Sequence, residues 1–254
     1  MSQTLIDISG LNKVFATKTG DVHALSDVNL TIGTGEFVSL LGPSGCGKTT
    51  LLKILAGLED HTSGEASISG APITKPRGDV GVVFQKPTLL PWRNIEDNVL
   101  LPIELHRKVT PKDRAAASAL LTKVGLGEFS RKHPDELSGG MQQRAAICRA
   151  LVHNPDVLLM DEPFGALDAM TRDALNVEVN RIWRDTAKTV VLITHSIPEA
   201  VFLSERVIVM GPRPGRIIDI IDIPFGKERT LDLLGSSEFA RISSGIRKYF
   251  EVTV

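Results

Sequence analysis

A glycine-rich segment places a lysine and a threonine at the start of a predicted apolar helix. Residues 42–49 are Gly-Pro-Ser-Gly-Cys-Gly-Lys-Thr, which fits the pattern G-x-x-x-x-G-K-[ST]. Glycines allow backbone conformations that a Cβ atom disfavours, so successive N–H groups can surround a phosphate at the helix N-terminus. We expect Lys48 to reach the β- and γ-phosphates of a nucleotide and the Thr49 hydroxyl to bind Mg²⁺. The alternative is a glycine loop that only precedes a core helix, and the flanking strand and helix argue against it.

An acidic pair follows a second apolar run. Residues 157–160 are Val-Leu-Leu-Met, and Asp161 and Glu162 come directly after them. Such a run predicts a buried strand, and ligands of open α/β sheets bind at the carboxyl ends of the strands. Asp161 suits the Mg²⁺ shell, whereas Glu162 faces another direction and can polarise an attacking water as a general base. A solvated acidic turn is the alternative, and the glycine-rich segment elsewhere in the chain makes it less favourable.

A third segment, LSGGMQQR at residues 137–144, predicts another helix start. Ser138, Gly139 and Gly140 open this helix, so the chain has a second N-terminus suited to an anion. One γ-phosphate needs only one close loop from each chain. The economical arrangement is a head-to-tail pair, in which this loop of one copy closes over the nucleotide of the other. An ordinary serine N-cap followed by two glycines is the alternative.

The elements that position these residues follow from the spacing of apolar side chains. Residues 37–42 are a nearly continuous apolar run, which predicts a buried strand directly before the glycine-rich segment. Apolar residues then recur at helical spacing from Thr49 to Leu58, so the order is strand, glycine loop and helix. The other predicted elements are strands and hairpins before residue 37, mostly helices over 87–155, buried parallel strands at 156–163 and 189–196, two strands around a Pro/Gly turn at 206–223, and a weak helical tail over 231–252.

Bulk composition indicates a soluble globular protein without an overall basic charge, which leaves local basic patches open. The chain has 254 residues, of which 42% are hydrophobic and 23% charged, and its net charge is −1. This balance gives no global field that would recruit nucleic acid. Cys46 and Cys148 have no metal-ligand spacing and form no disulfide framework, which favours a reducing compartment. We find no secretory signal and no apolar run of roughly 20 residues that could span a bilayer, so work at a membrane requires docking on a partner.

In combination the three motifs are specific, and the chain resembles the ATP-binding subunit of an ABC transporter to about residue 220. Gly42–Thr49 matches Walker A, Leu137–Arg144 matches the ABC signature and Val157–Glu162 matches Walker B. The resemblance implies an α/β fold with a RecA-like P-loop NTPase core, an antiparallel β subdomain and an inserted α-helical subdomain. It implies one ABC-type domain over residues 1–254, with the core at about 1–87 and 156–222, the helical subdomain at about 88–155 and a short C-terminal tail at about 223–254.

The resemblance also assigns roles to residues outside the three motifs. Gln85 matches the Q-loop glutamine, His195 the switch histidine and Phe15 the aromatic that stacks on adenine. GALD at 165–168 matches the D-loop, although Gly165 stands where serine is common. An active ATPase is implied, with Glu162, His195 and Gln85 as catalytic residues and with Thr49, Gln85 and Asp161 around Mg²⁺. The implied ATP-binding residues are Phe15, Gly42, Pro43, Ser44, Gly45, Cys46, Gly47, Lys48, Thr49, Thr50, Ser138, Gly139, Gly140, Gln142 and Asp168.

Each of the three single residues also has an ordinary structural interpretation. Phe15 alone would be a core aromatic, since most aromatics are packing residues. His195 alone would be a histidine with satisfied hydrogen bonds at a strand end, and Gln85 alone would cap a loop. Their positions relative to the three motifs favour the functional assignment.

The resemblance implies partners as well. We expect an ATP-dependent head-to-tail homodimer, integral membrane permease subunits, an indirect extracytoplasmic solute-binding protein, and a peripheral location on the cytoplasmic face of the inner membrane. LLPWR at 89–93 is an apolar segment that suggests a partner surface, although core packing of Trp92 is equally compatible. This segment and GPRPGRI at 211–217 resemble importers of nitrate, sulfonates and taurine.

Three other protein classes compete with a transporter subunit. A DNA-repair or translation-type ABC ATPase usually carries coiled-coil insertions or a second cassette, and this chain has neither. A small-molecule kinase would share the glycine loop but not LSGGMQQR. A switch GTPase would need a guanine-reading N-K-x-D motif, which is absent from the sequence.

Overall fold

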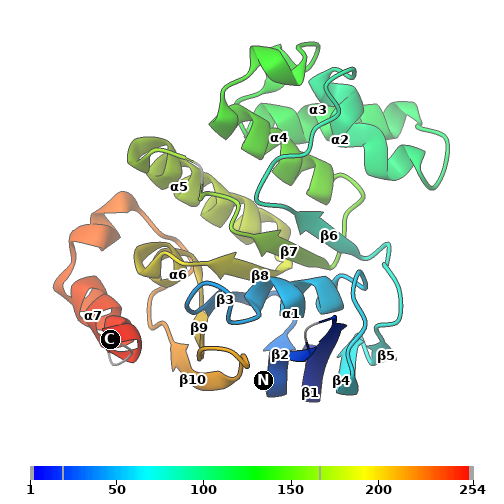
Figure 1. Cartoon of the computed structure of the whole chain (residues 1–254). Coiled ribbons are helices and arrows are strands. Elements are labelled where there is room, and N and C mark those ends of the chain that lie inside the picture. Colours follow the sequence, from blue (N-terminus) through cyan, green and yellow to red (C-terminus); the bar gives the residue numbers. More distant parts are fainter. Residues whose placement is uncertain (1–2, 19, 166, 252–254) are drawn as a thin grey trace. The chain divides into compact units, whose positions relative to one another are not determined.

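Residues 3–18, 20–165 and 167–251 are described by the computed structural model of the chain (Figure 1). Two units make up the fold: Met1–Arg77 with Val179–Val254, and Gly78–Glu178. The α/β class predicted from the sequence is confirmed, because helices occur together with parallel and antiparallel strands. No helix in the described residues is both long and apolar enough to cross a lipid bilayer.

The first unit begins with an antiparallel sheet, as the alternation of apolar and polar residues predicts. Ile6 and Ile8 are buried whereas Asp7 between them is exposed, which is the two-residue period of a half-buried strand. The strands pair in the order β2-β1-β4-β5. Their bounds are Thr4–Thr17 (β1), Gly20–Gly33 (β2), Ser63–Ile68 (β4) and Ala71–Pro72 (β5).

Parallel strands form the centre of the first unit. Strand β3 (Phe37–Leu41) lies between β8 (Thr189–Thr194) and β9 (Arg206–Met210) and is parallel to both. Strand β10 (Ile217–Asp222) pairs antiparallel with β9. All residues of β3 and β8 are buried, which explains why their sequences are mostly apolar. The strands predicted on either side of the Pro/Gly turn are confirmed.

Helix α1 (Lys48–Leu55) is shorter than the sequence predicted. Ala56 is its C-cap, and Gly57 has a φ of +69°. A Cβ atom at Gly57 would lie 2.2 Å from the backbone oxygen of Lys75, so the chain can turn there only with glycine. The apolar spacing continues to Leu58, but Leu58 is 51% exposed and lies outside the helix. The prediction of a helix to residue 58 was therefore wrong by about one turn.

The second unit combines two parallel strands with helices. Strand β6 (Val80–Val83) pairs with β7 (Val157–Asp161) in parallel. The segment between them is mostly helical, as predicted. Its helices are α2 (Ile95–Glu104), α3 (Pro111–Lys123) and α4 (Gly139–Leu151), with short 3₁₀ turns at Gly127–Phe129 and Pro134–Glu136. Helix α5 (Ala169–Thr186) follows β7 and runs on into the first unit of the chain.

The C-terminal tail is more regular than the sequence suggested. After α6 (Ile197–Leu203), β9 and β10, a 3₁₀ turn at Leu231–Gly235 leads to α7 (Ser237–Glu251). Phe239, Ile242 and Ile246 of α7 are buried, at the three- and four-residue spacing of one helix face. The prediction of a weakly patterned tail therefore understated this helix.

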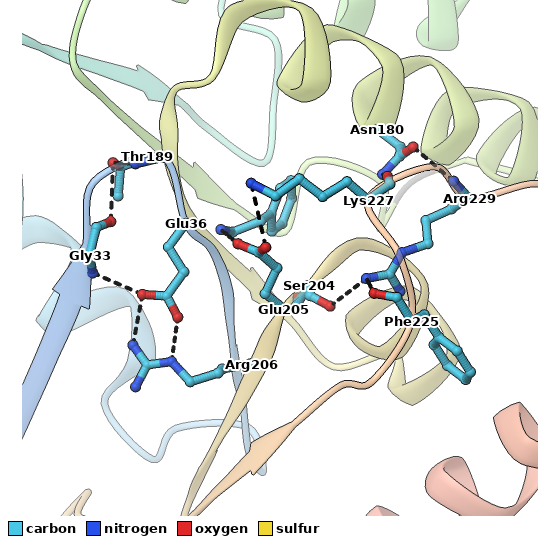
Figure 2. A network of polar contacts seen from close by, with 12 residues as sticks. Gly33, Glu36, Asn180, Thr189, Ser204, Glu205, Arg206, Phe225, Lys227 and Arg229 are labelled. Atoms are coloured by element: carbon cyan, nitrogen blue, oxygen red, sulfur yellow. Dashed lines mark hydrogen bonds and ion pairs between the residues drawn. The ribbon is translucent and has the colours of Figure 1, made fainter. Parts of the chain in front are cut away.

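Polar contacts hold the segment before α7 to the rest of the first unit (Figure 2). The Asn180 side chain on α5 donates to the backbone oxygen of Lys227 at 3.0 Å and accepts from the N–H of Arg229 at 3.2 Å. The Lys227 ammonium lies 3.5 Å from the Glu205 carboxylate and 4.8 Å from the centre of the Trp183 ring. These contacts make the tail part of the folded unit.

Candidate functional site

The glycine-rich segment forms a tight loop between β3 and α1 in the first unit. Gly45 has a φ of +76°, and Gly47, the N-cap of α1, has a φ of +102°. A Cβ atom at Gly47 would lie 2.7 Å from the backbone oxygen of Ala24. Both the conformation and this close approach require glycine, which is the physical reason for the G-x-G-K part of the motif.

Lys48 occupies the mouth of this loop. Its ammonium donates to the backbone oxygens of Gly42 at 2.7 Å and Pro43 at 3.0 Å, and the residue is 5% exposed. A cation with so little exposure to solvent requires acceptors of this kind for its hydrogen bonds. Leu51, Leu52, Ile54 and Leu55 of α1 are buried, so the helix that carries the lysine is fixed by packing. The arrangement leaves a positive charge and a helix N-terminus inside one loop, which suits a phosphate.

The other loop residues differ in exposure. Pro43, Ser44, Gly45 and Thr49 are exposed, whereas the Cys46 side chain is buried. The Cys46 sulfur lies 3.8 Å from the Lys48 ammonium. The residues predicted to bind phosphate, from Gly42 to Thr50, are thus brought together in one continuous loop and helix start.

In the second unit, the predicted base and the predicted Q-loop residue meet. Glu162 follows the last residue of β7, and Gln85 comes two residues after the end of β6. Because Val83 and Met160 are partners in the parallel register, the two segments leave the sheet side by side. The Gln85 side-chain amide lies 3.4 Å from a Glu162 carboxylate oxygen. This pairing of residues 77 positions apart is consistent with one reaction centre.

Ser138 and the two glycines after it open α4, as predicted. The Ser138 hydroxyl accepts from the N–H of Met141 at 3.4 Å and is the N-cap of the helix, so the ordinary structural interpretation also holds. A Cβ atom at Gly140 would lie 2.7 Å from the Thr171 methyl group, so a larger residue there would require the Thr171 side chain to move. Gln142 points back to its own loop and donates to Pro134 O at 2.8 Å.

Three predicted residues lie at exposed or half-exposed positions. Phe15 on β1 is half-buried, with the Lys13 ammonium 4.5 Å from its ring centre, so it is not a core aromatic. His195 is exposed between β8 and the N-cap of α6. Asp168 accepts from the Thr171 hydroxyl at 2.6 Å, and this hydrogen bond lowers the pKa of the Asp168 carboxyl. Ala166, inside the predicted D-loop, lies outside the described residues.

Two polar residues of α4 that the sequence did not single out support the Gln85 segment. Gln143 is buried and donates to the backbone oxygen of Phe84 at 3.4 Å. Arg149 donates to the backbone oxygens of Pro87 at 2.7 Å and Thr88 at 2.8 Å, and burial lowers the pKa of its guanidinium. Gln143 is in helical phase with buried Ile147, which was a usable signal, whereas nothing in the sequence marked Arg149.

The apolar segment after Gln85 is shaped by one buried asparagine. Asn98 accepts from the N–H of Leu90 at 2.6 Å and donates to the backbone oxygens of Leu90, Arg93 and Asn94, each at 3.0 Å. These bonds fold residues 90–94 into a tight loop. Trp92 in this loop is 72% exposed, so core packing of the tryptophan is excluded.

Three features define the class of protein as a P-loop nucleoside triphosphatase. They are a phosphate loop between a buried strand and a helix, an acidic residue paired with a glutamine at the ends of parallel strands, and a second helix that starts with serine and glycine. A family model described as ABC transporter matches residues 25–165 of the chain.

Named relatives cover most of the chain. A taurine import ATP-binding protein of Roseobacter denitrificans is 49% identical over 87% of this chain and 83% of that protein. An aliphatic sulfonates import ATP-binding protein of Bacillus cereus is 41% identical over 97% of this chain and 96% of that protein. A nitrate import ATP-binding protein of Synechococcus elongatus is 45% identical over 86% of this chain and 81% of that protein. The chain belongs to the ABC transporter family.

Solved structures agree with this assignment. The dimeric structure of a post-hydrolysis ATP-binding cassette bound to ADP and phosphate is 33% identical, with a TM-score of 0.76 over 87% of this chain and all of that chain. The predicted RecA-like ABC fold is therefore confirmed. The chain is therefore an ATP-binding, ATP-hydrolysing protein of the ABC transporter type.

Proposed function

We propose that this subunit dimerises on ATP and energises the import, through a membrane permease, of nitrate, a sulfonate, taurine or a related small solute. The loops described above bind and hydrolyse its ATP. The observation that carries the proposal is the buried Lys48 ammonium, held by Gly42 O and Pro43 O inside a loop with two left-handed glycines. A nucleotide phosphate offers oxygens to the same ammonium and to the N–H groups of the loop.

ATP binding is assigned to both units of the chain. In the first, the residues from Gly42 to Thr50 surround the phosphates, and Phe15 stacks on adenine because its ring is half-exposed. In the second, Ser138, Gly139 and Gly140 present a helix N-terminus, with Gln142 supporting their loop. We assign these to the ATP of the other copy, so that the homodimer is head-to-tail and Asp168 lies at its seam.

Hydrolysis is assigned to Glu162, Gln85 and His195. The Glu162 carboxylate accepts a proton from the attacking water, and Gln85, whose amide lies 3.4 Å from this carboxylate, orients the water. His195 donates a hydrogen bond to the γ-phosphate from the end of β8. We assign Mg²⁺ to the Thr49 hydroxyl of the first unit and to the Asp161 carboxylate and Gln85 amide of the second, whose oxygens are of the type that Mg²⁺ prefers. The ion would neutralise charge on the phosphates.

The permease contact is assigned to the exposed loop at residues 89–94. Trp92 projects into solvent while Asn98 holds the loop backbone in place, so an apolar anchor is presented on a rigid support. Movement of Gln85 on ATP binding would reach this loop through Arg149, which holds the intervening Pro87 and Thr88.

The proposal extends to the solute class, the location and the subdomains. Relatives are named for the import of taurine, aliphatic sulfonates and nitrate, which supports an importer of such a small solute with a separate extracytoplasmic binding protein. We place the subunit on the cytoplasmic face of the membrane beside its permease. The division into a core at 1–87 and 156–222, a helical subdomain at 88–155 and a tail from 223 stays a proposal.

Substitution of the loop lysine tests this function. Purified Lys48→Ala protein should lose Mg-ATP binding by at least about tenfold, because a charge-assisted contact to phosphate is removed. Cells carrying this variant should lose uptake of taurine, an alkanesulfonate or nitrate. Lys53→Ala, which removes an exposed lysine from the same helix, should keep both activities. Unchanged ATP binding by the Lys48 variant would contradict the assigned site, and unchanged uptake of all three solutes would contradict the solute class.

A further inference from the structure

The turn between β9 and β10 packs against the phosphate loop. Gly215 in this turn is so close that a Cβ atom there would lie 1.9 Å from the backbone oxygen of Cys46. The guanidinium of Arg213 in the same turn donates from Nε to the backbone oxygen of Gly45 at 3.2 Å. Two successive carbonyl groups of the phosphate loop therefore face the turn.

The turn is itself fixed in place by β2. The N–H of Gly215 donates to Ala24 O at 2.9 Å, and the N–H of Ser26 donates to Gly215 O at 2.9 Å. Because both backbone polar groups of Gly215 are hydrogen-bonded, the turn is a rigid support for Arg213. The contact with Gly45 is thus made from a defined position, although the Arg213 side chain is exposed.

The direction of these carbonyls determines the direction of the N–H groups that follow them. In a trans peptide the C=O and the next N–H point to opposite sides of the chain. When Gly45 O and Cys46 O face the turn, the N–H groups of Cys46 and Gly47 point away from it. The Cys46 N–H points toward Pro43 O at 3.4 Å, the same oxygen that accepts from Lys48 at 3.0 Å. The amide is therefore directed into the interior of the phosphate loop.

We propose that Arg213 is a positioning residue for nucleotide binding, which holds the Gly45–Cys46 peptide so that its N–H faces the phosphates. This inference rests on the proposed nucleotide site and adds a residue to which the sequence assigned no part in nucleotide binding. Arg213 acts through the loop and not on the hydrolysed bond. It stabilises the contact between this N–H and the α- and β-phosphate oxygens. Because both nucleotides carry these phosphates, the affinities for ADP and ATP increase equally.

A matched pair of arginines in one turn tests the proposal. Arg213→Ala should weaken Mg-ADP binding by about threefold to tenfold and raise the KM for ATP by a similar factor, with kcat changed less than about twofold. Arg216→Ala removes the same charge from the same turn, and among the described residues its exposed side chain makes no hydrogen bond or ion pair with the phosphate loop. It should bind as wild type. Arg213→Lys should restore part of the affinity, because an ammonium can donate to the same carbonyl.

The melting temperatures of the nucleotide-free variants separate positioning from a general loss of structure. Arg213→Ala should melt within about 2 °C of wild type, since a surface contact is lost. The proposal is overturned if Arg213→Ala binds ADP as wild type does, or if both alanine variants weaken binding equally. These results, combined with lost binding by Lys48→Ala, would leave the proposed nucleotide site intact. Unchanged binding by Lys48→Ala would instead show that the proposed site is wrong.

Discussion

At the scale of single residues, Glu162 has an uncommon backbone conformation. Its φ of +44° is left-handed, a conformation that costs energy for a residue with a Cβ atom. The strand before it is buried through Met160, so the chain is fixed up to that point. This geometry directs the carboxylate toward the Gln85 amide. A strained residue at a strand end, beside a polar partner, is typical of a reaction centre.

The first prediction at this scale concerns the base itself. Glu162→Gln should reduce ATP hydrolysis at least about a hundredfold, because an amide cannot accept the proton of the attacking water. The ATP-bound dimer should persist, since binding residues are unchanged, and size-exclusion chromatography with ATP should detect it. Glu65→Gln, the same change at an exposed position of β4, should hydrolyse ATP as wild type does. Hydrolysis at the wild-type rate by the Glu162 variant would contradict its role as base.

At the scale of elements, the end of α6 depends on a residue from the C-terminal tail (Figure 2). Arg229 is 3% exposed, and its guanidinium donates to Val201 O and Ser204 O at 3.3 Å and to Phe225 O at 3.1 Å. The last carbonyl groups of a helix lack intrahelical donors, so the arginine supplies them. Burial lowers its pKa to about 10, and the residue remains charged at neutral pH. The tail is therefore a structural part of the fold.

Removal of this arginine should destabilise the protein. Arg229→Met should lower the free energy of unfolding by about 2–4 kcal/mol, because buried carbonyl groups lose their donor. Urea unfolding followed by circular dichroism would measure the change. Arg241→Met, at a position of α7 whose side chain is 73% exposed, should change stability by less than about 0.5 kcal/mol. Equal unfolding midpoints for the two variants would show that the tail contact is not structural.

At the scale of the whole molecule, each chain carries two loops suited to phosphate. Lys48 lies in the first unit and Ser138 in the second. In the proposed head-to-tail dimer, each ATP is bound by the lysine loop of one copy and the serine loop of the other. A closed pair with twofold symmetry contains two such sites.

Mixed dimers distinguish this arrangement from binding within one chain. Lys48→Ala and Ser138→Arg proteins should each be inactive alone. A one-to-one mixture should recover about a quarter of wild-type hydrolysis when sites act independently, because half of the pairs are mixed and each has one intact site. A mixture as inactive as the two separate proteins, despite dimers detected by crosslinking, would contradict the shared site. A mixture of wild type with Lys48→Ala serves as the reference for exchange between dimers.

Much of the fold was predictable because its signals are local. The continuous apolar runs of β3, β7 and β8 predicted buried strands, and the glycines before Lys48 predicted the loop, since both depend on neighbouring residues. The end of α1 was misplaced, because the close approach of Lys75 O to Gly57 involves a residue 18 positions away that periodicity does not report. Helix α7 was underestimated although its buried face is regular.

The sequence alone determined which chemistry the chain carries: Lys48, Asp161, Glu162 and Ser138 stand in motifs whose spacing is sufficient to identify a nucleotide-binding ATPase. Only the tertiary structure showed the Gln85–Glu162 contact, the exposed Trp92 and the Arg213 bond to the phosphate loop. Motifs are local because a tight loop is made by adjacent residues. Contacts between distant segments depend on strand order, register and packing, which no short stretch of sequence contains.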